Sequence, residues 1–215
     1  MEKYIDQTLL KPDTSDEILK DFINKSKNYD FFAICLNPVH TAEAKRILQS
    51  TDIKVVTVVG FPLGANKTEI KIKEAESVLK DGADEIDMVM NIGKLKSTDY
   101  GYVENEIRNV KNICGEKILK VIIETSLLSL DEIKTACEII ASAGADFVKT
   151  STGFLGEGAK LEYIKLIKDI LKPPVKIKAS GGIRSLKDAV NMIKAGADRI
   201  GTSSGFAIAD EAKKL

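Results

Sequence analysis

A short apolar segment followed by a longer amphipathic one recurs through the whole chain, and this alternation restricts the possible folds more than any other feature. Eight such units in 215 residues give about 27 residues per unit, a length that suits a β-strand followed by a helix. The segments rich in Val, Ile and Phe, which we expect to form strands, are Tyr4–Asp6, Phe32–Cys35, Val55–Val59, Glu85–Met90, Leu119–Glu124, Phe147–Thr150, Val175–Ala179 and Arg199–Thr202. Between them, segments such as Lys67–Lys80 and Leu130–Ser142 carry apolar residues three and four positions apart, which predicts helices.

The tripeptide Gly-Ala-Asp occurs three times, at residues 82–84, 144–146 and 196–198, each time just before an expected strand. Glycine readily adopts the left-handed conformation that ends a helix, so this tripeptide predicts a turn from helix back into the sheet. The recurrence of one joint indicates one repeated architecture, and we expect residues 1–215 to form a single domain.

Glycine-rich turns cluster late in the chain, at Thr150–Gly153, Ala179–Gly182 and Gly201–Gly205. A doubly wound α/β sheet is the alternative to a barrel, but it usually has fewer strands and a phosphate loop after the first strand. We therefore predict a closed (β/α)8 barrel, the TIM-barrel fold. Its active site would lie at the carboxyl ends of the strands, and phosphate would bind at the loops after the last two strands.

Composition excludes several classes of protein. Lys+Arg and Asp+Glu both number 32, and this balance argues against nucleic acid as a partner. No apolar run approaches the roughly 20 residues that cross a membrane, and the polar, acidic start is unlike a signal peptide. The three widely spaced cysteines, Cys35, Cys114 and Cys137, are typical of reduced thiols, so we expect a cytoplasmic protein.

The chain has one histidine, His40, which limits histidine-dependent hydrolases and metal sites to a single imidazole. It follows Asn37 and Pro38 where a helix should open, and we expect it at the surface or at that helix start. No metal and no cofactor is expected.

Charged residues interrupt the expected strands, which in a parallel barrel should be almost continuously apolar. They are Asp87, Lys120, Glu124, Lys149, Lys176 and Lys178. The two-residue period places Lys120 with Glu124, and Lys176 with Lys178, on the face that we take as the barrel interior. For Lys120, Glu124 and Lys176 we favour a structural salt-bridge network or strand ends in solvent. Lys149 and Lys178 each precede a glycine-rich turn at the catalytic end, so we favour a chemical role for them.

Two neighbouring lysines can support carbonyl chemistry. A second ammonium about 5.5 Å away, at an effective dielectric constant of about 20, costs roughly 3 kcal/mol and lowers an amine's pKa by about two units. The amine then attacks a carbonyl and forms a Schiff base, whose protonated nitrogen acts as an electron sink. A carboxylate such as Asp87 can hold the second lysine and relay protons through water.

Several motifs resemble the deoxyribose-phosphate aldolases, which are class I, Schiff-base-forming aldolases. The two lysine motifs, Phe147–Phe154 and Lys176–Arg184, are together highly specific. The other matching segments, which follow the family's order along the chain, are Ile5–Pro12, Cys35–Pro38, Gly60–Gly64, Glu85–Asn91 and Lys120–Thr125.

The resemblance implies reversible cleavage of 2-deoxy-D-ribose 5-phosphate to D-glyceraldehyde 3-phosphate and acetaldehyde, as in deoxyribonucleotide catabolism. It implies Lys149 as the Schiff-base residue, Lys178 as the second lysine and Asp87 as the proton-transfer carboxylate. The residues implied to lie near the sugar or its phosphate are Asp6, Thr8, Cys35, Thr150, Gly181, Gly182, Ser203 and Ser204. The partners would be small sugar phosphates and aldehydes, and the chain would form a homo-oligomer, a dimer or a tetramer, as the family commonly does.

The sequence departs from the family pattern at Gln7, where many relatives carry histidine, and at Phe154, where one branch has a lysine directed at phosphate. The C-terminal segment Gly205–Leu215 lacks the terminal tyrosine of that branch. Two other functions remain open. One is a different Schiff-base barrel, such as a transaldolase-like or keto-acid aldolase, and the other is a non-catalytic barrel that binds a phosphorylated metabolite.

Overall fold

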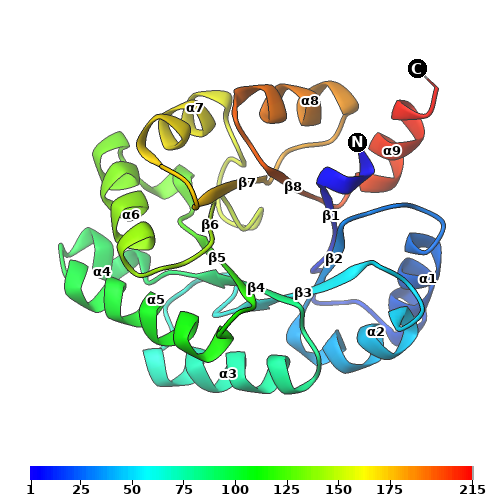
Figure 1. Cartoon of the computed structure of the whole chain (residues 1–215), viewed down its shortest axis with the longest axis horizontal. Helices are drawn as coiled ribbons and strands as arrows, with labels where there is room; N and C mark the ends of the chain where they lie inside the picture. The colour runs from blue at the N-terminus through cyan, green and yellow to red at the C-terminus, as the bar shows by residue number, and fades with distance from the viewer. Residues whose placement is uncertain (215) are drawn as a thin grey trace.

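Eight parallel strands form a closed barrel in the computed structural model, which describes residues 1–214 (Figure 1). Each strand pairs with the next along the chain, and the last pairs with the first. The strands are β1 (Ile5–Leu9), β2 (Ala33–Leu36), β3 (Lys54–Val59), β4 (Glu85–Val89), β5 (Ile118–Ile122), β6 (Phe147–Lys149), β7 (Lys176–Ser180) and β8 (Arg199–Thr202). The predicted (β/α)8 barrel is therefore confirmed.

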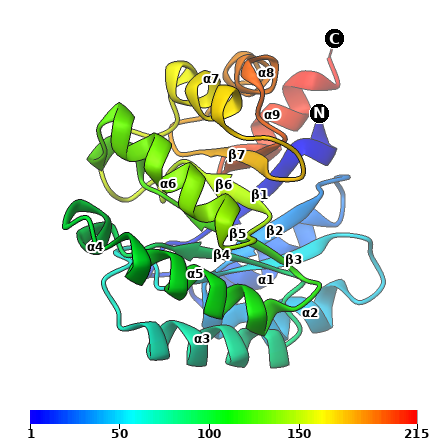
Figure 2. The same ribbon diagram turned by 60° about the vertical axis from the view of Figure 1, so that its left-hand side comes forward.

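Helices cover the outside of the barrel, as the side view shows (Figure 2). They are α1 (Asp16–Ser26), α2 (Thr41–Leu48), α3 (Thr68–Lys80), α4 (Ile92–Lys96), α5 (Tyr100–Cys114), α6 (Leu130–Ser142), α7 (Leu161–Ile170), α8 (Leu186–Ala195) and α9 (Gly205–Ala212). Short 3-10 helices lie at η1 (Glu2–Tyr4), η2 (Pro38–His40) and η3 (Thr125–Leu127). In both views η1 lies beside α9, so the first and last described segments are neighbours. Within residues 1–214, no helix is both long and apolar enough to span a bilayer.

The strand boundaries differ from the predicted ones by a few residues. Tyr4 belongs to η1, and β1 continues to Leu9. Glu124 and Thr150 lie beyond the ends of β5 and β6. Glu124 adopts a left-handed conformation with φ of 53°, so the two-residue alternation no longer governs where its side chain points. His40 ends η2 directly before α2, at a helix start as expected.

The three Gly-Ala-Asp joints close the barrel in one shared way. Their glycines have φ of 97°, 81° and 118°, the left-handed region that was predicted. Each aspartate N–H then donates to a carbonyl on the preceding strand, and its carboxylate accepts the N–H of that same residue. The pairs are Asp84 with Val55, Asp146 with Leu119, and Asp198 with Ile177. These aspartates therefore tie β3 to β4, β5 to β6 and β7 to β8.

The first strand pair lacks such a carboxylate. Phe32 occupies the corresponding position between β1 and β2, and its N–H donates to the Ile5 carbonyl at 3.1 Å. The centroid of its ring instead lies 3.4 Å from the guanidinium carbon of Arg199.

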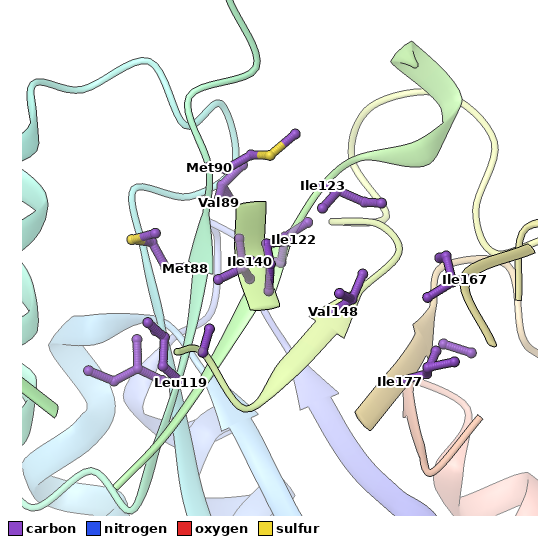
Figure 3. Packing of buried hydrophobic residues seen from close by; sticks show 14 of the residues in the cluster. Met88, Val89, Met90, Leu119, Ile122, Ile123, Ile140, Val148, Ile167 and Ile177 are labelled. Atoms are coloured by element: carbon purple, nitrogen blue, oxygen red, sulfur yellow. The ribbon is translucent and has the colours of Figure 1, made fainter. Parts of the chain in front are cut away.

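The apolar core lies mainly between the strands and the helices. Outward-facing side chains of adjacent strands, such as Leu119, Val148 and Ile177, pack with Ile140 of α6 and Ile167 of α7 (Figure 3). All five are almost completely buried. This outer layer supplies the apolar burial that stabilises the barrel, and it leaves the interior free for polar side chains.

The interior is built of layers contributed by alternate strands, as in other barrels of this type. The even-numbered strands supply a lower layer of Ala33, Glu85, Phe147 and Arg199. They also supply an upper layer of Cys35, Asp87, Lys149 and Gly201. Between these lies a layer from the odd-numbered strands, namely Asp6, Val56, Lys120 and Lys178. Ionisable residues thus occupy all three layers.

Candidate active site

Lys149 and Lys178 lie opposite each other on the neighbouring strands β6 and β7. Both Nζ atoms donate to the same oxygen, Oδ2 of Asp87, each at 2.8 Å. The two nitrogens are therefore separated by at most twice that distance. Lys149 is 3% exposed and Lys178 is fully buried, so both amines lie in the barrel rather than in bulk solvent.

Asp87 on β4 connects these lysines to a third one. Its Oδ1 accepts a hydrogen bond from Lys120 Nζ at 2.8 Å. Burial alone would raise the pKa of the Asp87 carboxyl, but Lys120, Lys149 and Lys178 outweigh burial and hold this pKa well below its ordinary value. Asp87 therefore stays an anion among three amines and accepts hydrogen bonds from all of them.

Lys178 is held between two carboxylates, Asp87 and Asp6 of β1. Burial alone would lower the pKa of Lys178, but these two anions outweigh it and raise the pKa. Gly201 on the adjacent strand makes room for this side chain, because a Cβ there would lie 2.9 Å from Lys178 Cε. Lys178 is thus a fixed cation beside Lys149.

The contacts continue around the interior and return to their starting point. Arg199 donates to Asp6 Oδ1 at 2.9 Å and lies 3.5 Å from Glu85 Oε2. Glu85 in turn pairs with Lys120 at 2.5 Å, and Lys120 pairs with Asp87. We call this set the charge ring; its members are Asp6, Glu85, Asp87, Lys120, Lys149, Lys178 and Arg199.

A cavity of about 260 Å³ opens above the charge ring at the carboxyl ends of the strands, and Lys149 lies at its floor. Its other lining residues are Thr8, Leu9, Leu10, Lys11, Thr152, Gly153, Phe154, Ser180, Gly181, Gly182, Ile183, Arg184, Gly201, Thr202 and Ser203. This cavity and the charge ring together form the candidate active site.

Four of the residues expected near the substrate border this cavity. They are Thr8, Gly181, Gly182 and Ser203. Gly181 has φ of 83°, and a Cβ there would lie 2.9 Å from the Cα of Gly158, so the glycine allows two loops to touch. The expected contacts of Thr8 with the sugar and of Gly181, Gly182 and Ser203 with the phosphate stay predictions.

The other four do not border the cavity. Asp6 lies in the charge ring. Cys35 is buried in the upper layer, and burial raises the pKa of its thiol. The Thr150 hydroxyl donates to the Ser180 carbonyl at 3.1 Å, and Ser204 precedes α9, with its N–H donating to Thr202 Oγ1 at 2.9 Å. Their predicted substrate contacts remain predictions.

Gln7, the position where many relatives were expected to carry histidine, has a clear structural contact. Its Oε1 accepts the Gly205 N–H at 2.8 Å, and its Nε2 donates to the Ser203 carbonyl at 3.3 Å. Gln7 therefore fixes the loop after β8. Phe154, the second departure, is half exposed at the cavity rim, where its ring packs edge-on against Phe61.

The expectations for Lys120, Glu124 and Lys176 have different outcomes. Lys120 does belong to a buried salt-bridge network, as favoured, but that network includes Asp87. Lys176 is exposed at the start of β7, so the favoured interpretation of a strand end in solvent is confirmed for this residue. Glu124 is buried and accepts hydrogen bonds from the N–H and hydroxyl of Thr152, and burial raises the pKa of its carboxyl.

Sequence reasoning missed Glu85 and Arg199 in the ring, and Lys11 and Arg184 at the cavity. Glu85 and Arg199 each stand directly after a Gly-Ala-Asp joint, and the two-residue alternation puts Glu85 on the same face of its strand as Asp87. No group of three or more His, Cys, Asp or Glu side chains in residues 1–214 is arranged to hold a metal ion.

Comparison with known proteins adds an independent observation. The model of the DeoC/LacD family of aldolases matches residues 1–210. The chain is 52% identical over 210 residues to a deoxyribose-phosphate aldolase of Finegoldia magna, covering 98% of this chain and 99% of that protein. Among solved structures, an aldolase designated QR15 superposes with a TM-score of 0.96 at 48% identity and covers 99% and 96% of the two chains. A deoxyribose phosphate aldolase from Aeropyrum pernix, described as a unique tetrameric structure, gives 0.90 at 34% identity and 100% and 91% coverage.

Proposed function

The chain belongs to the DeoC/LacD family of aldolases, and from this membership we infer that Lys149 forms a Schiff base with the aldehyde carbon of 2-deoxy-D-ribose 5-phosphate. The activity is that of a deoxyribose-phosphate aldolase, a lyase. The observation that carries the proposal is the geometry of Lys149, whose amine lies at the floor of the cavity and contacts an anionic carboxylate beside a second lysine.

In the cleavage direction, the neutral Lys149 amine attacks C1 of the open-chain sugar phosphate. Loss of water leaves a protonated imine, which withdraws electrons from the C2–C3 bond. A base removes the proton of the O3 hydroxyl, the C2–C3 bond breaks, and D-glyceraldehyde 3-phosphate leaves. C1 and C2 remain on Lys149 as an enamine.

The enamine then takes a proton at C2, and water releases acetaldehyde from Lys149. Asp87 is suited to moving these protons, directly or through water, because its Oδ2 contacts both amines. Lys178 supports the same steps as a fixed cation that opposes a second positive charge on Lys149. In the reverse direction the same groups join acetaldehyde to the aldehyde carbon of glyceraldehyde 3-phosphate.

The phosphate would lie in the part of the cavity bordered by Gly181, Gly182 and Ser203, near the start of α9. Lys11 and Arg184 border the same cavity, and neither forms an ion pair with another side chain in residues 1–214. These two cations are available to a phosphate and could replace the lysine that one branch of the family carries at the position of Phe154. We also propose that the protein acts in deoxyribose phosphate catabolism in the cytoplasm. Residues 1–215 would form a single domain, and the chain would assemble into a homo-oligomer.

Reduction of the Schiff base tests this function. Protein incubated with acetaldehyde and borohydride should gain one ethyl group, and peptide mapping should place it on Lys149. Lys120→Met serves as a control for reaction at another buried lysine, because the adduct should stay on Lys149.

Adduct formation with a ketone donor but not with acetaldehyde would favour a different Schiff-base aldolase. Binding of the sugar phosphate with no adduct under either condition would favour the non-catalytic barrel.

A further inference from the structure

The charge ring contains three carboxylates and four basic groups, and all seven are almost completely buried. The carboxylates are Asp6, Glu85 and Asp87, and the basic groups are Lys120, Lys149, Lys178 and Arg199. With Lys149 protonated, the ring therefore carries one uncompensated positive charge. With Lys149 neutral, anions and cations are equal in number. Charges in a protein interior act on one another over longer distances than in water, because the interior screens them less.

Two members of the charge ring lie away from the Lys149 amine and the cavity. Glu85 and Arg199 belong to the lower layer, and neither contacts Lys149 nor borders the cavity above it. Their placement is nevertheless well fixed. Arg199 bonds to Asp6 and stacks on the Phe32 ring, while Glu85 pairs with Lys120.

We propose that Glu85 and Arg199 are positioning residues that set the protonation of the Lys149 amine from a distance, each through its charge in the ring. The proposal rests on the Schiff-base role of Lys149 and extends it. Glu85 favours the protonated amine and Arg199 the neutral amine. Each acts through the intervening layer, which carries Asp6, Lys120 and Lys178.

Other ionisable groups face Lys149 from the surrounding elements and belong to the same electrostatic environment. They are Asp87 of β4, Lys178 of β7, Lys120 of β5, Asp6 of β1, Cys35 of β2, Glu124 beyond β5, and Lys11 and Arg184 at the cavity. Glu124 is held by Thr152 and forms no ion pair in residues 1–214. These groups remain in every variant used below, so differences between variants report the charges of residues 85 and 199.

The test is the pH profile of kcat/KM for sugar-phosphate cleavage, whose rising limb reports loss of the proton from the amine. Arg199→Met removes a cation, so the amine keeps its proton longer and the midpoint moves to higher pH. Glu85→Gln removes an anion, so the midpoint moves to lower pH. At an effective dielectric constant of about 20, each shift should be about one pH unit.

Matched variants separate charge from structure. Arg199→Lys and Glu85→Asp keep the charges and disturb the same contacts, so their midpoints should stay near that of the unmodified protein. The double variant Glu85→Gln/Arg199→Met removes one charge of each sign and should restore the midpoint. If one single variant fails to fold, the sign of the other shift and the double variant still decide the matter.

Single-variant shifts of the same sign, no shift, or equal shifts in charge-keeping and charge-removing variants would overturn the proposal. Borohydride trapping in each variant distinguishes this failure from a failure of the proposed function. An ethyl adduct on Lys149 with an unmoved pH profile overturns only the remote control by Glu85 and Arg199. Absence of the adduct in the unmodified protein overturns the Schiff-base function itself.

Discussion

Two regions of this molecule bury lysines beside carboxylates, and the pKa values of these groups shift in opposite directions in the two regions. Outside the barrel, Lys71 of α3 donates to Glu106 of α5 at 2.9 Å and to the Val89 carbonyl at 2.9 Å. There burial outweighs the pairing, so the pKa of Lys71 is lowered and the pKa of Glu106 is raised. In the charge ring the pairing outweighs burial, so the pKa of Asp87 is lowered and that of Lys178 is raised.

The difference lies in the number of charged partners. Glu106 has one lysine against it, whereas Asp87 has three, and Lys178 has two carboxylates. One oppositely charged partner offsets only part of the desolvation free energy of a buried ion, while several such partners can offset all of it. An isolated pair can therefore hold helices together, but a network can keep ions charged beside a substrate.

The largest effect should come from Lys149→Arg, because a guanidinium keeps its proton and cannot form an imine. We expect turnover to fall by at least about 10⁴-fold, measured as aldehyde release from the sugar phosphate. Lys71→Arg is the matched control at the other buried lysine, and its folded fraction should retain activity. Turnover of Lys149→Arg near that of the unmodified protein would exclude the assigned role.

Asp87→Asn should be next in size. The amide keeps the shape but cannot accept a proton, so we expect kcat to fall by about 10²- to 10⁴-fold while KM changes little. Glu106→Gln, which makes the same change in the isolated pair, should leave kcat nearly unchanged. Equal losses in kcat and in sugar-phosphate binding for Asp87→Asn would contradict proton transfer by this carboxylate.

Variants of the isolated pair, Lys71 and Glu106, should instead change the free energy of unfolding. Lys71→Met leaves Glu106 buried without its cation and should cost about 3–5 kcal/mol of unfolding free energy. The double variant Lys71→Met/Glu106→Gln removes both charges and should recover most of this loss. Denaturant unfolding of the four proteins in this cycle gives the coupling, and an additive result would mean that the two residues act independently.

Acid unfolding should also separate the two regions. The folded pKa values of Asp6 and Asp87 lie below their ordinary value of 3.8, so their contribution is present above about pH 4 and is lost as pH falls through the folded values. The pKa of Glu106 is raised, so its contribution to stability changes with pH in the opposite direction: as pH falls, the folded state takes up this proton before the unfolded state does. Asp87→Asn should therefore flatten the loss of stability below pH 4, whereas Glu106→Gln should not.

The barrel was predictable because its signal is repeated. Eight alternations and three Gly-Ala-Asp joints each indicated the same βα unit, and the glycine conformations agree. The strand ends were less predictable. Glu124 follows β5 without a break in the apolar pattern, and only its left-handed backbone, set by tertiary contacts such as that with Thr152, removes it from the strand.

Within the site, the sequence indicated Lys149, Lys178 and Asp87 from their positions in apolar strands, and the structure brings these three together. The sequence could not indicate which charged side chains on different strands pair, because the stagger between neighbouring strands decides which side chains lie at the same height in the barrel. Repulsion between the two amines is only one part of the electrostatics, because carboxylates also hold the second lysine. Lys178 in fact lies between Asp6 and Asp87, and this contact depends on residues 172 and 91 positions away in the chain.

One feature of the barrel wall links its assembly to its chemistry. Asp84, Asp146 and Asp198 tie three of the eight neighbouring strand pairs of the barrel, and at the corresponding position between β1 and β2 the Phe32 ring stacks on Arg199 instead. Between β1 and β2 the Phe32 N–H still donates to the Ile5 carbonyl, but the Ile5 N–H donates to the Glu2 carbonyl rather than to a carboxylate, and the side chain at position 32 supports Arg199. We therefore expect local opening between β1 and β2 before the three tied strand pairs open. The Ile5 amide should then exchange its hydrogen with solvent sooner than the amides of Val55, Leu119 or Ile177.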